Sequence, residues 1–200
     1  QAYLKASNTG AGDNFGGTVA LTGDGNTLVV GASLESSAAI GINGNEVHDC
    51  AAIPPVNCNN YSCAVYLYTR SAGIWTKQTY IKPSYAQAPF FPTSMSISTD
   101  GNTLAIGNLY DYSFGNGSLT SSGAVYLYTR SGTIWMQPSR IYSSNPGAND
   151  YFGSSVSMSG DGNTLAVGAY QESSAATGVN NTAPGQSDNS TPSAGAVYLH

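Results

Sequence analysis

The sequence contains very little charge. Only 8% of its 200 residues are Asp, Glu, Lys or Arg, whereas soluble domains usually carry about 25%. Six Lys and Arg against 11 Asp and Glu give a net charge of -5, and the basic residues form no cluster. Because a nucleic-acid-binding surface needs Lys and Arg to neutralise phosphates, these numbers argue against a nucleic-acid partner.

Long apolar runs and an initiator Met are also missing. The chain has no run of about 18 apolar residues, so we expect no membrane span. It begins at Gln1 without a signal peptide, which suggests the start of a processed or partly traced chain.

Catalytic signatures are equally scarce. There are two histidines, neither of which recurs in another copy of the repeat, and no nucleophile elbow, HExxH sequence or phosphate-binding glycine loop occurs. We therefore expect no enzymatic activity, although a pair of glycosidase carboxylates forms in space and is not visible in a sequence.

What the sequence has in abundance is repetition. "AVYLYTRSAGIW" begins at Ala64, "AVYLYTRSGTIW" at Ala124, and "AVYLH" at Ala196. Each is preceded by a hairpin-like segment: "GDGNTLVVGA", "TDGNTLAIGN" and "GDGNTLAVGA". The variation in repeat length falls between these two landmarks, as expected when one loop per repeat lies in solvent.

Each repeated landmark has the pattern of β-strands. In "AVYLYTR", Val65 and Leu67 alternate with Tyr66 and Tyr68, which places the two pairs on opposite faces of a strand. Asp24-Gly25 lies between two alternating runs and predicts a tight primed hairpin turn, in which Gly accepts a positive φ. No segment has helical periodicity, so the predicted fold is all-β.

Four antiparallel strands per repeat make a propeller blade. The predicted fold is a β-propeller-like arrangement of about three four-stranded antiparallel blades, in one repeat region over residues 1–200. The predicted blade limits are about 8–82, 83–142 and 143–200, and residues 1–7 are the outer strand of a neighbouring or closing blade.

The third copy lacks its fourth strand. Three explanations follow: a longer propeller, an unusually small ring whose ends complete one blade, or a strand accepted from a neighbouring molecule. The last would be head-to-tail and would build a fibre if the rotation does not close.

The repeated segments resemble the FG-GAP repeat family, which also forms the propellers of integrin α-subunits, and most closely its bacterial-type variant. The matching letters are "FG" at Phe15-Gly16 and Phe152-Gly153, and "VGA" beginning at Val30 and Val167. The middle copy departs from the pattern, with Phe91-Pro92 in place of Phe-Gly.

The resemblance implies calcium as a candidate cofactor, because integrin-like relatives bind it through Asp-rich loops between inner strands. In this sequence the corresponding oxygen donors are Glu35, Asn43, Glu46, Glu172, Asn180 and Asp188. The dense D-x-D-x-D-G string is absent, whereas calcium prefers six to eight oxygens. We interpret the repeated Asp24, Asp100 and Asp161 as hairpin residues and not as metal ligands.

The three cysteines lie close together, at Cys50, Cys58 and Cys63. With His48 they could be counted as zinc ligands, but the close CxxC spacing of zinc sites is missing. In a chain this poor in charge we expect an oxidising, extracellular or cell-surface setting and one disulfide among the three. Glycosylation sequons occur at Asn60, Asn116, Asn180 and Asn189.

The functional prediction is a non-catalytic, extracellular structural or adhesive protein. The preferred form is a subunit of a surface assembly or fibre, joined to other copies by strand complementation at blade edges. The alternative is a binding module that recognises a protein or glycan through its variable loops.

Overall fold

The computed structural model describes residues 1–37, 39–46, 63–83, 91–112, 119–179, 186 and 188–200. These residues form three antiparallel sheets, none of them closed into a ring. The predicted all-β class is confirmed. Within the described ranges there is no helix with the length and apolar character needed to cross a membrane.

Blade 1 contains the four predicted strands. They are β1 (Phe15–Leu21), β2 (Thr27–Ala32), β4 (Ala64–Ser71) and β5 (Ile74–Lys82), in that spatial order, and the short β3 (Gly41–Ile42) pairs with the outer side of β5.

Blade 2 has a divided fourth strand. After β6 (Ser94–Ile97), β7 (Thr103–Asn108) and β8 (Ala124–Ser131), both β9 (Ile134–Trp135) and β10 (Ser139–Ile141) pair with β8. Pro138 lies between β9 and β10 and has no N–H group for the ladder, which explains the interruption.

Blade 3 has three strands: β11 (Phe152–Met158), β12 (Leu165–Ala169) and β13 (Ala196–Leu199). β13 pairs with β12 on one side, and among the described residues no strand lies on its other side.

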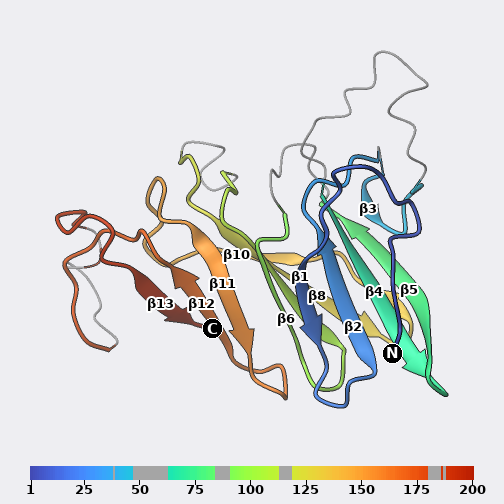
Figure 1. Cartoon of the computed structure of the whole chain (residues 1–200). Helices are drawn as coiled ribbons and strands as arrows, with labels where there is room; N and C mark the ends of the chain where they lie inside the picture. Colours follow the sequence, from blue (N-terminus) through green and yellow to red (C-terminus); the bar gives the residue numbers. More distant parts are fainter. Residues whose placement is uncertain (38, 47–62, 84–90, 113–118, 180–185, 187) are drawn as a thin grey trace.

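The three sheets lie side by side, with blade 2 in the middle (Figure 1). Val29, Val65 and Leu67 of blade 1 pack in one buried cluster with Tyr126 and Tyr128 of blade 2. A second cluster repeats this arrangement between blade 2 and blade 3, with Ala105 and Val125 against Phe152, Leu165 and Val167. Blade 2 thus offers an aromatic-rich face to blade 1 and a face of small and aliphatic residues to blade 3.

The Phe-Gly pairs begin the first strand of blades 1 and 3 with a bulge. Gly16 and Gly153 have positive φ values of 94° and 87°, and the register with the second strand shifts directly after Phe15 and Phe152. Proline fixes φ near -65°, so Pro92 of the middle copy cannot adopt this conformation, and β6 begins only at Ser94.

The Asp-Gly-Asn hairpins are present in all three blades, but the turn is longer than predicted. In blade 1 the Thr22 N–H donates to the Thr27 carbonyl at 3.0 Å, which leaves four residues in the loop. Asp24 Oδ1 accepts hydrogen bonds from the Thr22 hydroxyl at 2.6 Å and the Asn26 N–H at 2.9 Å. Only Gly25 of the loop has a positive φ. Because the Asp24 carboxylate accepts hydrogen bonds from donors of its own loop, the structure supports its interpretation as a hairpin residue.

Residues 1–7 form no strand in the structure. Leu4 and Ala6 pack against the aromatic face of blade 1, and the Tyr68 hydroxyl donates to the Lys5 carbonyl at 3.1 Å. The segment lies on blade 1 as the outer strand of a preceding blade would, but no strand of the described ranges pairs with it, so its assignment as an outer strand stays a prediction.

Candidate functional site

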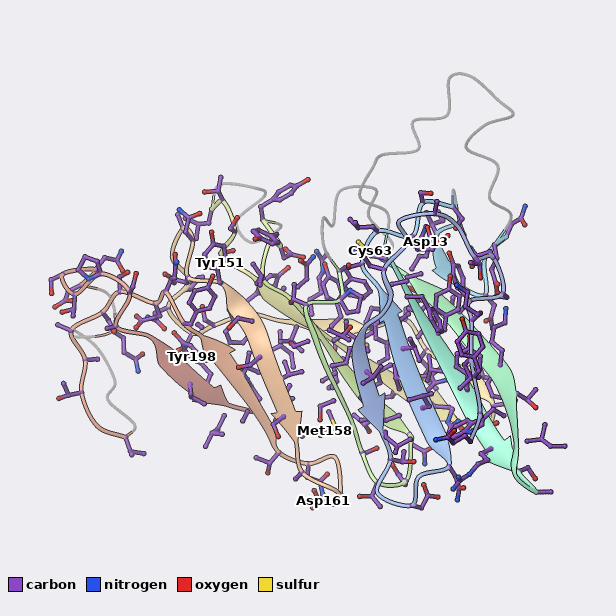
Figure 2. All side chains as sticks on the ribbon, viewed as in Figure 1. Asp13, Cys63, Tyr151, Met158, Asp161 and Tyr198 are labelled. Atoms are coloured by element: carbon purple, nitrogen blue, oxygen red, sulfur yellow. The ribbon has the colours of Figure 1, made fainter. Side chains whose placement is uncertain are left out.

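A buried carboxylate follows the second strand of every blade. Glu35, Asp111 and Glu172 are 0%, 5% and 2% exposed. Asp13, Cys63 and Tyr151 lie at one edge of the sheets, opposite the hairpin of Asp161 (Figure 2). The second strands β2, β7 and β12, which the three carboxylates follow, end at this edge, because their last residues pair with Ala64, Ala124 and Ala196. We call this edge of the molecule the acidic rim.

A tyrosine of the third strand reaches each of these carboxylates. In blade 1 the Tyr66 hydroxyl donates to Asn8 Oδ1 at 2.5 Å, and Asn8 Nδ2 donates to Glu35 Oε1 at 2.7 Å. Blade 3 repeats this relay through Tyr198, Asn145 and Glu172, at 2.6 and 2.9 Å. In blade 2 the Tyr126 hydroxyl donates directly to the Asp111 carboxylate.

In blade 1 the fourth strand completes the site. Lys82 Nζ lies 2.6 Å from Glu35 Oε2, and both side chains are almost fully buried. The Tyr80 hydroxyl lies 2.9 Å from the same carboxylate oxygen and 2.7 Å from the Ser37 hydroxyl.

The electrostatics of this site follow from burial and charge together. Burial alone would raise the pKa of Glu35, but the Lys82 ammonium and the hydrogen bonds of Ser37 and Tyr80 outweigh it and lower that pKa. Burial lowers the pKa of Lys82, and Glu35 offsets part of this effect. Burial, with the Glu35 charge, raises the pKa of Tyr80. Each of these two groups therefore stabilises the charged form of the other.

Blade 3 has no such cation of its own, because residues 143–200 contain neither Lys nor Arg. The ion pairs among the described residues are Lys82–Glu35 and Lys77–Glu46. Burial and the nearby Glu172 raise the pKa of Asp150, a buried carboxyl at the acidic rim, although the Gly147 N–H partly opposes them. This end of the molecule thus holds negative charge without a lysine.

The first predicted calcium loop does not fit the ion in this geometry. Glu35 and Glu46 are each paired with a lysine, and Asn43 Oδ1 accepts the Tyr80 N–H at 3.0 Å. A calcium ion would have to displace an ammonium group from both carboxylates. Over the described part of the chain, no group of three or more His, Cys, Asp or Glu residues could hold a metal.

In the third loop Asn180 lies outside the described residues. Glu172 accepts from Asn145 and Ser174, and Asp188 Oδ1 accepts the Ala175 N–H and the Ser190 hydroxyl at 3.0 and 2.9 Å. The Asp188 carboxylate therefore joins two parts of this loop, and calcium binding stays a prediction.

The remaining sequence predictions are only partly placed. Cys50, Cys58, His48, Asn60 and Asn116 lie outside the described residues. Cys63 is fully buried directly before β4, within the cluster between blades 1 and 2, and the disulfide stays a prediction. Asn189 is exposed, as an attached sugar requires.

The two outer faces of the stack expose apolar residues that are buried elsewhere. On blade 3, Val197 and Leu199 are 71% and 72% exposed, whereas their counterparts Val65 and Leu67 in blade 1 are 0% and 1% exposed. On blade 1, Val19 and Leu21 are 62% and 55% exposed, whereas their counterparts pack between blades: Met95 and Ile97 in blade 2, Val156 and Met158 in blade 3.

A groove runs beside the free edge of β13. It has a volume of about 560 Å³ and is lined by Asn145, Glu172, Ser174, Val197 and Tyr198, among others. Sequence reasoning missed both this groove and the Lys82–Glu35 pair. The available signal was the similarity of "QTYIK" before Pro83 to "QAYLK" at the start of the chain.

Comparison with known families supports the repeat interpretation. The sequence model of the FG-GAP repeat matches residues 1–46 and 135–200, more than half of the chain. The chain belongs to the FG-GAP repeat family. A search of curated proteins finds no match.

The FG-GAP matches cover β1, β2 and the described part of the following loop in blade 1, and then β10 of blade 2 and all of blade 3. They leave out β4 and β5 of blade 1 and the strands β6, β7 and β8 of blade 2, the copy with Pro92 in place of the motif glycine. Membership implies a β-propeller-type module, in agreement with the three stacked antiparallel sheets.

Proposed function

We propose that this FG-GAP chain is a non-catalytic structural or adhesive module of the extracellular space or cell surface, and that copies associate head to tail. The observation that carries the proposal is the exposure of Val197 and Leu199 at positions whose counterparts, Val65 and Leu67, are buried between blades. The exposed pair of blade 3 and the exposed Val19 and Leu21 of blade 1 are the two halves of the interface that joins the blades inside the chain.

A glycine at the free face of blade 3 supports this docking. In blade 2 a Cβ atom on Gly107 would lie 2.1 Å from the Gly153 carbonyl oxygen, so only a glycine at this position allows the backbone of blade 3 to pack against blade 2. Its counterpart Gly168 has no positive φ, and a Cβ there would meet only side chains of blade 3 itself. Blade 3 therefore keeps space for a neighbouring backbone.

The expected free energies of burial and of association are consistent with a weak but specific association. Burying a Val or Leu side chain contributes about 1.5–3 kcal/mol, and four such side chains lie on the two faces. Association costs at least about 4 kcal/mol in translational and rotational freedom. Backbone pairing at the free edge of β13 would add to the apolar contribution.

Association is measured by sedimentation velocity over a range of concentrations. We expect the unchanged chain to form larger species as concentration rises, and the variant Val197→Lys/Leu199→Lys to remain a monomer. Ile134→Lys is the matched control, because Ile134 is 71% exposed but is the first residue of β9, directly after the turn that follows β8. An unchanged chain that stays monomeric at every concentration would contradict the proposal.

A second candidate function, recognition of a glycan or protein, has one observation in its favour. Tyr110, Tyr151 and Tyr170 form an aromatic row at the acidic rim, with ring centroids 5.7 and 5.4 Å apart. Tyr170 is 55% exposed, and aromatic faces combine an apolar surface with a polar tip. Under this function, Tyr170→Ala would abolish binding in a glycan-array assay and leave sedimentation unchanged.

A further inference from the structure

In blade 1, the fourth strand β5 contributes two polar side chains to the acidic rim. Tyr80 and Lys82 of β5 both reach Glu35 Oε2, at 2.9 and 2.6 Å. Lys82 Nζ also donates to the Ser37 carbonyl at 2.5 Å. Ile81, between them in sequence, belongs to the cluster shared with blade 2. A Tyr-Ile-Lys segment thus places two polar groups on its own blade and one apolar group on the next.

Blade 3 contains the same carboxylate and serine that Tyr80 and Lys82 contact in blade 1. Glu172 and Ser174 are the counterparts of Glu35 and Ser37. The Ser174 N–H donates to Glu172 Oε1 at 3.1 Å, as the Ser37 N–H does to Glu35 Oε1 at 2.9 Å. The groove beside β13 is open where the tyrosine and lysine of a fourth strand would lie.

The beginning of the chain contains a second copy of the Tyr-x-Lys sequence of β5. Tyr3-Leu4-Lys5 matches Tyr80-Ile81-Lys82 in order and spacing. Leu4 packs on the aromatic face of blade 1, as Ile141 of β10 packs on that of blade 3. Tyr3 is 88% exposed, and Lys5 is also exposed. The segment already presents its apolar side to its own blade and its polar side to solvent.

We propose that the groove beside β13 binds a Tyr-x-Lys strand, and that Tyr3-Leu4-Lys5 of a second copy is that strand. The Lys5 ammonium takes the place of Lys82 against Glu172, and the Tyr3 hydroxyl takes the place of Tyr80 between Glu172 and Ser174. Leu4 stays on blade 1 of its own copy, so one segment joins both molecules.

Charge favours this occupant. Asp150 and Glu172 are 4% and 2% exposed, and neither forms an ion pair with a described residue. A buried charge is costly unless it is both hydrogen-bonded and paired with an opposite charge. The two carboxylates accept hydrogen bonds, but neither has an opposite charge beside it among the described residues. A lysine arriving with the strand supplies the positive charge that blade 1 obtains from β5.

The inference rests on the proposed head-to-tail association and is tested by a double-mutant cycle on the chain of residues 1–200. The changes are Lys5→Met and Glu172→Gln, singly and together, and the association constant is measured by sedimentation. We expect each single change to weaken association at least about tenfold, and the double variant to be no weaker than the worse single variant. Lys5→Arg should retain most of the association, and Arg70→Met is the control for the loss of an exposed cation, because Arg70 contacts Asn26 at the hairpin end of blade 1 and not the segment of residues 1–7.

Each outcome has a separate meaning. If Lys5→Met associates like the unchanged chain while Val197→Lys/Leu199→Lys does not, the proposed function holds and this inference is wrong. If the effects of the two single changes simply add, Lys5 does not contact Glu172, and the inference is also wrong. If the unchanged chain never associates, both proposals fail. Should Glu172→Gln unfold, as its melting curve would show, the exposed Lys5 still decides the question through its Met and Arg variants.

Discussion

Single buried side chains determine where this protein keeps its charge. Lys82 and Glu35 are both almost fully removed from water and satisfy each other at 2.6 Å. Lys77 and Glu46 form the other ion pair of the described residues, but their side chains are 31% and 21% exposed. Water can solvate a partner that is left behind in the second pair and cannot do so in the first.

Removing the lysine from each pair should therefore have very different effects. Lys82→Met leaves the Glu35 charge buried without a partner and should lower the free energy of unfolding by about 3–5 kcal/mol. Lys77→Met should lower it by no more than about 1 kcal/mol. Denaturant titration of both variants checks this, and equal losses would show that the Lys82–Glu35 pair is not buried as described.

Two aspartates should give opposite pH dependences. Burial, with the charge of Glu172, raises the pKa of Asp150 above 3.8 in the folded state. Folding then favours the protonated form, so this residue makes stability fall as pH rises from about 3.8 through the raised folded pKa. Hydrogen bonds from the Ser98 hydroxyl and the Asn102 N–H lower the pKa of Asp100. Its contribution to stability is full above 3.8 and is lost as pH falls through the lowered folded pKa.

The test compares Asp150→Asn and Asp100→Asn with the unchanged chain by denaturant unfolding between about pH 2.5 and 6. Relative to the unchanged chain, Asp150→Asn should gain stability as pH rises, and Asp100→Asn should lose it. Parallel curves for the two variants would contradict the assignment of these shifts.

Whether the side chains of a strand are buried depends on whether another blade packs against that strand. β4 and β13 share the letters "AVYL", but Leu67 is 1% exposed and Leu199 is 72% exposed. Leu67→Ala should therefore lower the free energy of unfolding of the monomer by about 2–5 kcal/mol, because it leaves a cavity between blades 1 and 2.

Leu199→Ala is the internal control for this loss. On an exposed surface such a change is usually within about 0.5 kcal/mol, so chemical denaturation of the dilute monomer should show almost no effect. A large loss for Leu199→Ala under those conditions would mean that blade 3 is already covered in the monomer.

Much of this element structure could be predicted from the sequence, because period-2 alternation and Asp-Gly turns are local signals. The strand faces of Val65 and Tyr66 followed from alternation alone. The division of the fourth strand around Pro138 and the four-residue hairpin loop did not, since both depend on which backbone groups find partners. The pairing of Lys82 with Glu35 could not be predicted from the sequence either. A lysine on a strand is usually solvated, and it is the loop after β2 that brings the carboxylate to it.

Over the whole molecule, the stack of blades has two different ends. Blade 1 presents Val19, Leu21 and the segment of residues 1–7, and blade 3 presents Val197, Leu199 and the edge of β13. Because the two surfaces differ, an interface between them is heterologous and continues at both ends of every oligomer. Such an assembly grows until an end is blocked.

Blocking one end at a time separates this arrangement from a symmetric dimer. We expect Val19→Lys/Leu21→Lys, which blocks the blade 1 end, and Val197→Lys/Leu199→Lys, which blocks the blade 3 end, each to be monomeric alone. An equimolar mixture should form a 1:1 heterodimer and nothing larger, since only one free end of each kind remains. Small amounts of either variant should also shorten the oligomers of the unchanged chain. If one variant alone forms a stable dimer in sedimentation experiments, its unblocked face pairs with itself, and the head-to-tail arrangement is wrong.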